Sequence, residues 1–206
     1  MGFMARDGTA TRERILTAAQ RLMIDEGYSA TSVDAVLAAA ATSKGAFFHH
    51  FESKRALADA LVERYVEADL QMLADGLAVA MDASDDPVVR AIAFVRHFED
   101  AAGEIMSGAS GCLYTTVLAE SELISVGASE PILAAIIAWR DRFSELLVAA
   151  LASRPEAGDD LDVDALSDHL FVTFEGAFLL ARAAADPDHM RRQMATFRRL
   201  LEALLT

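Results

Sequence analysis

Residues 31–54, TSVDAVLAAAATSKGAFFHHFESK, constrain the fold of this chain more than any other stretch. They predict two short helices joined by a tight turn, with a third helix starting directly after them. Thr31 is the predicted N-cap of the first helix, and Asp34 would complete a variant of the capping box. Ser43 is placed to cap the second helix, which we expect over residues 44–51. That helix carries a lysine, a glycine and two histidines, which is unusual for an element that only fills a core.

The second helix has the residue order of an element that enters a DNA major groove. Its first turn would meet base edges while flanking groups meet phosphates, and Lys44 and Gly45 lie in that turn. His49 and His50 lie about 100° apart around the helix axis, so we expect one to point at DNA and the other along its edge. In isolation, such histidines would more often be a solvated helix end or a core hydrogen bond. A zinc site is not expected, because adjacent helical positions do not converge on one ion.

This stretch resembles the DNA-binding domain of the TetR (tetracycline-repressor) family of transcriptional regulators. The resemblance rests on SKGAFFHHFESKRAL, on Thr31-Ser32 before it, and on a preceding helix that ends near Gly27. It implies that Lys54 contacts a DNA phosphate. The pattern and the resemblance together predict DNA contacts by Thr31, Ser32, Ser43, Lys44, Gly45, Phe48, His49, His50 and Lys54.

Two positions depart from the family pattern. Ala41-Thr42 stands where the family usually has Gly-Val, which predicts mild strain in the turn between the two helices. Phe48 stands where a tyrosine is frequent, so a hydroxyl that could bond a phosphate is missing. Phe48 could instead cover a thymine methyl group.

Apolar residues recur at helical spacing through the rest of the chain. A helix over residues 11–26 has one apolar stripe, and a long helix starts at Lys54. We expect a loose arm over residues 1–10 and a loop over residues 103–111. The predicted fold is all-α with about nine helices. The resemblance implies a helix–turn–helix domain over residues 1–53 and a domain for effector binding and dimerisation over residues 54–206.

The charge is unevenly distributed along the chain. The net charge is −14, yet acidic and basic residues balance within residues 1–60, so the rest of the chain carries the whole excess. An acidic body would be repelled by phosphates everywhere except at the neutral head, which favours one docking orientation. The alternative is that the acidity reflects only the general composition of the host's proteins.

The composition also bears on localisation. No apolar run is long enough to span a membrane, and the N-terminus lacks the apolar core of a secretory signal. We therefore expect a cytoplasmic protein without membrane contact. The single cysteine, Cys112, cannot form an internal disulfide. A buried, inert thiol is the preferred interpretation, with a redox or electrophile sensor as the alternative.

The segment from Gly111 to Glu120 resembles the short central helix that many family members place beside their ligand cavity. Aromatic residues elsewhere in the C-terminal region hint at a hydrophobic small-molecule effector, although an aromatic residue in such a region more often belongs to a plain core than to a pocket lining. The candidate ligand-binding residues are Phe94, His97, Phe98, Tyr114, Trp139, Phe143, Phe171 and Phe174.

The last two predicted helices are amphipathic and suit a four-helix bundle formed with a second copy of the chain, which is how the family dimerises. Burial within one chain would give a similar pattern. The candidate dimer-interface residues are Phe171, Gly176, Phe178, Met194, Phe197 and Leu201.

An enzyme is not expected, because the chain has no glycine-rich phosphate loop, no GxSxG, no HExxH and no paired ExxH. We predict no cofactor and no metal. The predicted function is a homodimeric, ligand-responsive repressor that binds a pseudo-palindromic double-stranded operator and is released by a small hydrophobic effector. The alternative is a DNA-binding regulator that is constitutive or controlled by a protein partner.

Overall fold

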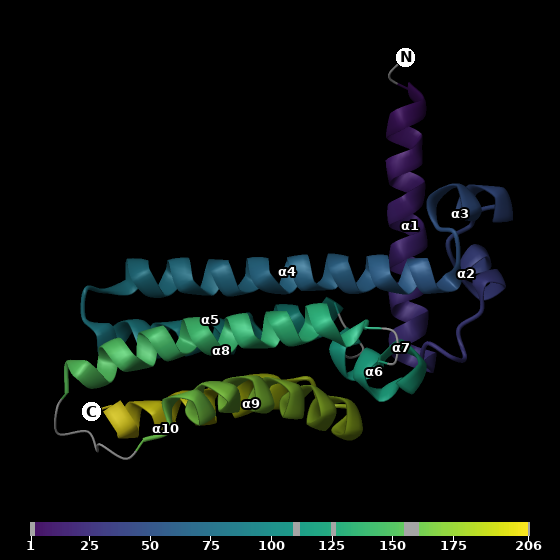
Figure 1. Cartoon of the computed structure of the whole chain (residues 1–206). Helices are drawn as coiled ribbons and strands as arrows, with labels where there is room; N and C mark the ends of the chain where they lie inside the picture. The colour runs from purple at the N-terminus through teal and green to yellow at the C-terminus, as the bar shows by residue number, and fades with distance from the viewer. Residues whose placement is uncertain (1–2, 109–111, 125–126, 155–160, 206) are drawn as a thin grey trace. The chain divides into compact units, whose positions relative to one another are not determined.

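The computed structural model of the chain describes residues 3–108, 112–124, 127–154 and 161–205. Within these ranges the chain is helical and forms no strand, which confirms the predicted all-α class (Figure 1). The shortest helix, α7, is a single turn. The helices are α1 (Phe3–Glu26), α2 (Val33–Ala39), α3 (Lys44–His50), α4 (Lys54–Ala83), α5 (Pro87–Gly108), α6 (Leu113–Ala119), α7 (Ser121–Ile124), α8 (Ser129–Ala152), α9 (Val163–Ala184) and α10 (Asp188–Leu205).

The chain divides into two compact units. Unit 1 consists of Met1–Glu67 and Ser110–Ile132, and unit 2 consists of Ala68–Ala109 and Leu133–Thr206. The long helix α4 contributes residues to both. Because α6 and α7 belong to unit 1, a segment from the middle of the chain completes the same compact body as the N-terminal helices.

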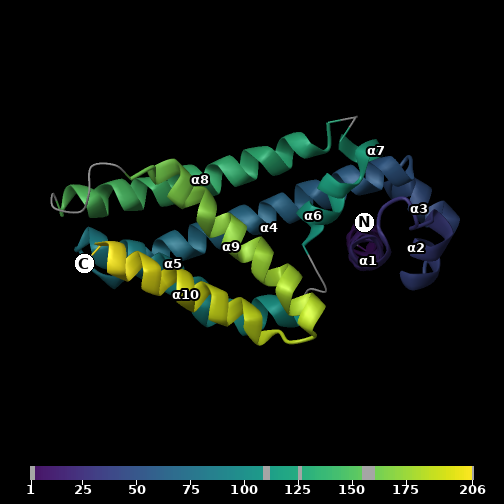
Figure 2. The same ribbon diagram turned by 90° about the horizontal axis from the view of Figure 1, so that it is seen from below.

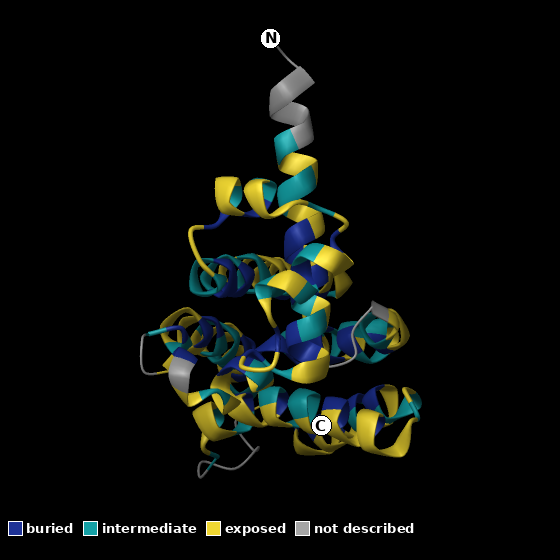
Figure 3. Ribbon diagram, turned by 90° about the vertical axis from the view of Figure 1, so that its right-hand side faces the viewer, coloured by how far each residue is buried: buried dark blue, intermediate teal, exposed yellow. Residues whose placement is uncertain are grey.

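The helix α1 is the central element of unit 1 and contacts α2, α3 and α6. Its apolar stripe is buried as its helical spacing predicts (Figure 3). The most deeply buried residues of this stripe are Ile15, Leu16, Ala19 and Met23. Arg64 of α4 binds α1 beside this stripe, since its Nη1 donates to Glu13 Oε2 at 3.0 Å and its Nη2 to Gln20 Oε1 at 2.5 Å.

Serine side chains cap both helices of the helix–turn–helix. Ser32, not Thr31, is the N-cap of α2, because its Oγ accepts a hydrogen bond from the Ala35 N–H at 3.0 Å. The predicted capping box is therefore wrong, since the residue three positions after the true cap is an alanine. Ser43 caps α3 as predicted, and its Oγ accepts from the Ala46 N–H at 3.2 Å.

The turn between α2 and α3 places Ala41 in the left-handed region, with φ of 47°. The Ala41 N–H donates to the Ala38 carbonyl and the Thr42 N–H to the Leu37 carbonyl, which is the hydrogen-bond pattern of a Schellman motif. A residue with a Cβ is disfavoured in this conformation by about 1–2 kcal/mol relative to the right-handed one. The strain predicted for an alanine at this position is thus present.

In unit 2, the C-terminal helix α10 packs along α5 and against α9 (Figure 2). Its buried face consists of Met190, Met194, Phe197, Leu201 and Leu205. At the edge of this face, Arg198 Nε donates to Glu99 Oε2 of α5 and Arg198 Nη1 to Glu202 Oε1, both at 2.6 Å. The bond to Glu99 is the first cause that raises the pKa of Arg198 above its ordinary value. This ion pair fixes α10 against α5.

Two segments are more helical than the sequence predicted. Instead of a loose arm over residues 1–10, α1 begins at Phe3, and instead of a loop over residues 103–111, α5 continues to Gly108. Residues 109–111 lie outside the described ranges. Neither segment contains proline, and a single glycine costs a helix only about 1 kcal/mol, which neighbouring helical residues can offset.

Gly76 allows two aromatic rings of unit 2 to approach α4 closely. A Cβ at this position would lie 2.7 Å from Phe98 Cζ and 3.1 Å from Phe94 Cε2. Gly76→Ala should therefore lower the free energy of unfolding by about 1–3 kcal/mol through overpacking. Urea denaturation followed by circular dichroism would measure the change.

Gly103 provides the matched control, because it is also helical but a Cβ there would have no neighbour within 4 Å. Gly103→Ala should raise the free energy of unfolding by about 1 kcal/mol through helix propensity alone. Equal stabilisation by both substitutions would contradict the close packing of the two rings on α4.

Candidate functional site

The helix α3 exposes one continuous face. Lys44, Gly45, Phe48 and His49 are exposed, and Phe48 keeps 48% of its accessible surface. Phe47 on the opposite side is fully buried, and its ring meets the Phe48 ring edge-on at 5.2 Å between centroids. The exposed face therefore combines a cation, an imidazole, an open glycine and an apolar ring.

The two histidines of α3 occupy different environments. Their rings are 5.0 Å apart, but His49 is exposed while His50 is half-buried. The pKa of His50 is lowered, first by burial and then by the positive charges of His49 and Arg12. The Arg12 guanidinium lies 5.4 Å from the centre of the Phe51 ring, so a cation of α1 lies beside the C-terminal end of α3.

The side chain of Lys54 packs against the turn between α1 and α2. Its Nζ is 4.1 Å from the centre of the Tyr28 ring and 3.5 Å from the Ser29 carbonyl oxygen. The Tyr28 ring beneath the Lys54 ammonium group is buried in the core of unit 1. Lys54 is the first residue of α4, which places its charge beside the helix–turn–helix.

Thr31 and Ser32 have separate roles in this turn. Thr31 is 1% exposed, and its Oγ1 donates to the Gly27 carbonyl at 2.8 Å. Its hydroxyl therefore closes the turn in this conformation, and its predicted DNA contact stays a prediction. Ser32 is exposed at the start of α2. The predicted DNA-binding residues thus share one region of unit 1, except that Thr31 lies beneath its surface.

Sequence reasoning missed Glu120, which lies at the junction of α6 and α7. Its carboxylate accepts hydrogen bonds from the Ser29 N–H at 3.2 Å and from the Ser29 hydroxyl at 2.7 Å. No local sequence pattern could predict this contact, because Ser29 and Glu120 are 91 positions apart.

The candidate effector residues do not form one group. Phe94, Phe98, Trp139 and Phe143 make a cluster in unit 2, with ring centroids 5.2–6.1 Å apart in the neighbouring pairs. His97 lies beside this cluster, since its ring meets that of Phe98 at 5.0 Å. Three of the four aromatic rings in the cluster are fully buried.

The remaining candidates lie elsewhere. Tyr114 belongs to unit 1, where its ring meets that of Tyr65 at 5.0 Å. Phe174 pairs with Phe178 along α9 at 5.4 Å, and Phe171 is half-buried on the same helix.

A polar side chain lies next to the aromatic cluster. The Trp139 Nε1–H donates to Asp69 Oδ2 of α4 at 3.0 Å. Within the described ranges, no three His, Cys, Asp or Glu side chains are placed to hold a metal ion. The surface of this cluster is therefore mainly aromatic carbon, and the hydrogen bond between Trp139 and Asp69 lies at its edge.

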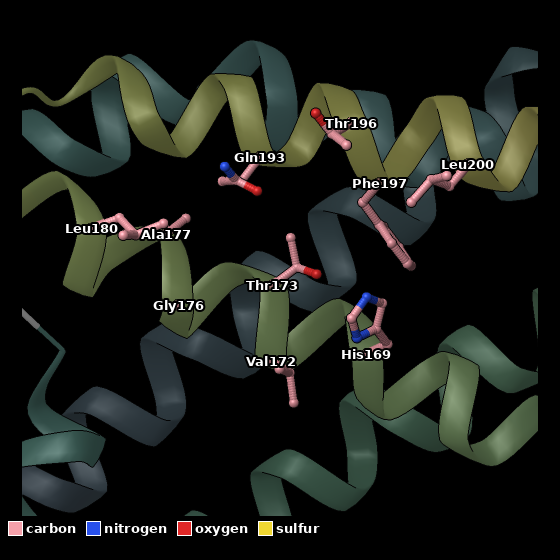
Figure 4. A pocket seen from close by; sticks show the side chains of 10 residues that line it. All are labelled: His169, Val172, Thr173, Gly176, Ala177, Leu180, Gln193, Thr196, Phe197 and Leu200. Carbon is pink, nitrogen blue, oxygen red and sulfur yellow. The ribbon is translucent and has the colours of Figure 1, made fainter.

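The outer side of α9 and α10 carries a groove of about 290 Å³ (Figure 4). Val172, Leu180 and Leu200 line it together with small and polar residues such as Gly176 and Gln193. Several large apolar side chains of the two helices are exposed around it. They are Val172, Leu179, Leu180, Leu200 and Leu204.

Half of the six candidate dimer-interface residues are covered by their own chain. Phe178, Met194 and Leu201 are each less than a tenth exposed, because they pack into the core of unit 2. Phe197 belongs to the same core, and its ring also lines the groove (Figure 4). Gly176 is exposed in the groove, and Phe171 is half-buried. The predicted dimer interface therefore stays a prediction, with three of its six residues covered by their own chain.

Cys112 is buried at the N-terminal end of α6, and the Tyr65 hydroxyl lies 3.6 Å from its Sγ. This placement fits the interpretation of a structural thiol. Within the described ranges, no helix is long and apolar enough to cross a membrane.

Two family models match the chain. The model described as "Bacterial regulatory proteins, tetR family" matches residues 15–61, and the model described as "Tetracyclin repressor-like, C-terminal domain" matches residues 87–197. The first match covers the second half of α1, all of α2 and α3, and the start of α4. The second covers more than half of the chain.

Individual proteins are similar over nearly the whole length. The chain is 29% identical over 196 residues to the transcriptional regulator AcuR of Cereibacter sphaeroides, which covers 95% of this chain and 87% of the relative. It is 29% identical over 179 residues to the HTH-type transcriptional repressor DhaR of Mycobacterium sp. strain GP1, which covers 85% and 83%.

Solved structures share the architecture. The crystal structure of a TetR transcriptional regulator from Chloroflexus aurantiacus J-10-FL matches with a TM-score of 0.77 and 29% identity, covering 96% of both chains. A regulatory protein TetR from Rhodobacter sphaeroides matches with a TM-score of 0.72 and 28% identity, covering 91% of this chain and 96% of that one.

DNA binding should strengthen as the pH falls from about 7.5 to 6, by about threefold. The lowered pKa keeps His50 neutral at pH 7 in the free protein, and nearby phosphates would favour its charged form. The effect on folding has the opposite sign. The pKa of His50 is lower in the folded protein than in the unfolded chain, so the free energy of unfolding decreases as the pH falls below the value in the unfolded chain. Fluorescence anisotropy with labelled DNA at several pH values would measure the effect.

His50→Gln should flatten this pH dependence, whereas His97→Gln in unit 2 should leave it unchanged. Circular dichroism at each pH would verify that both variants remain folded. An unchanged pH profile in His50→Gln would place His50 away from the phosphates.

Proposed function

Because this chain belongs to the TetR family of DNA-binding transcriptional regulators, we propose that it is a homodimeric repressor released from its operator by a small hydrophobic effector. One relative, DhaR, is named a repressor, which supports repression as the mode of action. We assign the helix–turn–helix DNA-binding domain to residues 1–53, with Lys54 directly after it as a further DNA contact, and effector binding and dimerisation to residues 54–206. Family membership also makes the chain a regulator and not an enzyme, as its sequence predicts.

The observation that carries this proposal is the exposed face of α3. Lys44 and Gly45 lie in its first turn, directly after the Ser43 cap, and the buried Phe47 fixes the helix's rotation. The first turn of a recognition helix is the part that reaches base edges in the major groove. In the proposed complex, Lys44 reads a base while Ser32 and Lys54 contact the DNA backbone.

The charge distribution supports a single docking orientation. The net charge of −14 lies outside residues 1–60, where acidic and basic residues balance. A neutral head on an acidic chain is repelled least when the head faces the phosphates. It also implies modest non-specific affinity, because few phosphates are neutralised by each subunit.

We propose the outer side of α9 and α10 as the dimer interface. Leu179 and Leu200 are 70% and 60% exposed there, beside the groove that Gly176 helps to form. Burying such side chains against a second copy would remove apolar surface from water. Two copies would then place their α3 helices in successive major grooves, about 34–36 Å apart.

The aromatic cluster of Phe94, Phe98, Trp139 and Phe143 is the proposed effector site. Effector binding there would favour a conformation that no longer fits the operator, and the effect is bounded by the effector's different affinities for the two conformations. Each tenfold loss of DNA affinity requires a difference of about 1.4 kcal/mol.

A specific observation favours the alternative function. Phe94, Phe98 and Phe143 are fully buried and in contact with one another, as in a filled core. A regulator without an effector would have this arrangement. A thermal-shift screen separates the two functions, since only the first predicts compounds that raise the melting temperature and also release operator DNA.

Selection of bound duplexes from a random pool tests DNA binding most directly. The proposed function predicts enriched sequences with two inverted half-sites separated by one helical turn or a multiple of it. Enrichment of a single half-site would contradict binding as a dimer. Failure to enrich any sequence at low salt would contradict DNA binding itself.

Lys44 and Lys54 should differ in how they affect sequence preference. Lys44→Ala should cost about 1–3 kcal/mol on the selected operator and relax specificity at one base position. Lys54→Glu should weaken binding to all sequences alike, because phosphates carry no sequence information. Gel-shift titrations against the operator and its single-base variants would measure both effects.

Arg142→Glu makes the same charge change as Lys54→Glu on an exposed residue of unit 2 and should change affinity little. If Lys54→Glu altered binding to only one operator variant, its role at a phosphate would be wrong.

Replacing both Leu179 and Leu200 with glutamate should produce a monomer, because the charges would have to be buried in the proposed interface. Operator affinity should fall at the same time, since the two half-sites would no longer be linked. Leu133→Glu is the control, because Leu133 is 57% exposed on α8. Analytical ultracentrifugation would measure the mass, and an unchanged dimer in the double variant would exclude this interface.

A further inference from the structure

The turn between α1 and α2 is held by a carboxylate from a distant part of the chain. Glu120 accepts two hydrogen bonds from Ser29, at 2.7 Å from the hydroxyl and 3.2 Å from the backbone N–H. Gly27, two residues earlier, has φ of 91°, and a Cβ there would lie 3.1 Å from Glu120 Oε1. The carboxylate therefore lies directly against the backbone of the turn.

The backbone of Glu120 is fixed on both sides. Its N–H donates to the Val117 carbonyl at the end of α6, and its carbonyl accepts from the Leu123 and Ile124 N–H groups of α7. Glu120 is the C-cap of α6, with an extended backbone. Its side chain is thus carried by the junction of two helices, and a displacement of that junction would reach Ser29 directly.

The turn that Glu120 holds also positions groups proposed to contact DNA. Lys54 Nζ lies over the Tyr28 ring and 3.5 Å from the Ser29 carbonyl, while Ser32 at the end of the turn caps α2. Thr31 closes the turn from inside through its bond to the Gly27 carbonyl. One short backbone segment therefore joins Glu120 to Lys54 and to the start of α2.

We propose that Glu120 is a positioning residue for DNA binding, which holds the α1–α2 turn, and through it Lys54 and Ser32, in the geometry that meets the DNA backbone. Residue 120 falls in the region matched by the C-terminal family model, while the turn falls in the region matched by the N-terminal one. The bond thus links the two regions inside one compact unit.

Glu120 is ionised at neutral pH in this setting. The hydrogen bond from the Ser29 hydroxyl is the first cause that lowers its pKa, followed by the bond from the Ser29 backbone, with a smaller contribution from Lys54. A charged acceptor makes stronger hydrogen bonds than a neutral one. The two hydrogen bonds from Ser29 to the Glu120 carboxylate therefore keep their full strength throughout the neutral pH range.

The sign of the mutational effect separates positioning from simple charge. An anion close to Lys54 repels phosphates, so a pure charge effect predicts tighter DNA binding when Glu120 is removed. Loss of positioning predicts weaker binding, because Lys54 and Ser32 would have to be ordered during binding. The two explanations predict changes of opposite direction.

The experiment compares operator affinity of the full-length wild-type protein with that of Glu120→Ala, Ser29→Ala and the double variant, using the operator obtained by selection. Glu120→Ala should bind about fivefold more weakly, which corresponds to about 1 kcal/mol. Ser29→Ala should have a smaller effect, since the backbone bond remains. Glu26→Ala removes an exposed carboxylate at the end of α1 and should leave affinity unchanged or raise it.

The double variant provides the decisive comparison. Positioning through this contact predicts that Ser29→Ala adds nothing once Glu120 is absent, whereas independent effects would add. Affinities are compared well below each variant's melting temperature, so that unfolding does not contribute. Equal or tighter binding by Glu120→Ala, or additive losses, would overturn the inference.

This inference rests on the operator binding proposed above, and the two can fail separately. If the wild-type protein bound no operator, the proposed function would be wrong. If the wild-type protein bound and Glu120→Ala bound as tightly as Glu26→Ala, only the role of Glu120 would be wrong.

Discussion

The burial of Phe47 is the constraint on which the DNA-binding region depends. Its ring is fully buried in unit 1, and Phe51 beside it is 3% exposed. With that side of α3 fixed, the helix has a single face left for solvent, and Lys44 and Phe48 lie on it. The same packing that stabilises the head therefore decides which side chains can reach a base. In the proposed complex, DNA recognition would use the face of α3 opposite to the one that folding buries.

Unit 1 contains more than the helix–turn–helix. The helices α6 and α7 complete it. At their junction, Glu120 accepts a hydrogen bond from Ser29 in the α1–α2 turn, and the Lys54 side chain packs against the same turn. A displacement of α6 or α7 would therefore reach this turn within one compact unit. Coupling of this kind requires a contact with two alternative arrangements, and a surface carboxylate bond is easily broken and re-formed.

Apolar side chains of unit 2 fall into two groups, one buried in its core and one exposed on its surface. The inner faces of α5 and α10 hold a dense core, closed at its edge by the ion pair of Arg198 with Glu99. The outer side of α9 and α10 keeps large apolar residues such as Leu179 in water. Neighbouring exposed apolar side chains support the proposal that this side contacts a second copy of the chain.

The sequence by itself determined the features that depend on local interactions: the helical class, the Ser43 cap and the strained Ala41. Each is set by residues a few positions apart, through helical periodicity or a hydrogen bond to the nearest turn. Only the tertiary structure decided that Thr31 lies inside its turn, that Met194 faces its own core, and that Glu120 holds Ser29. Those facts depend on which surfaces meet after distant segments pack, and periodicity carries no information about the partner of a given face.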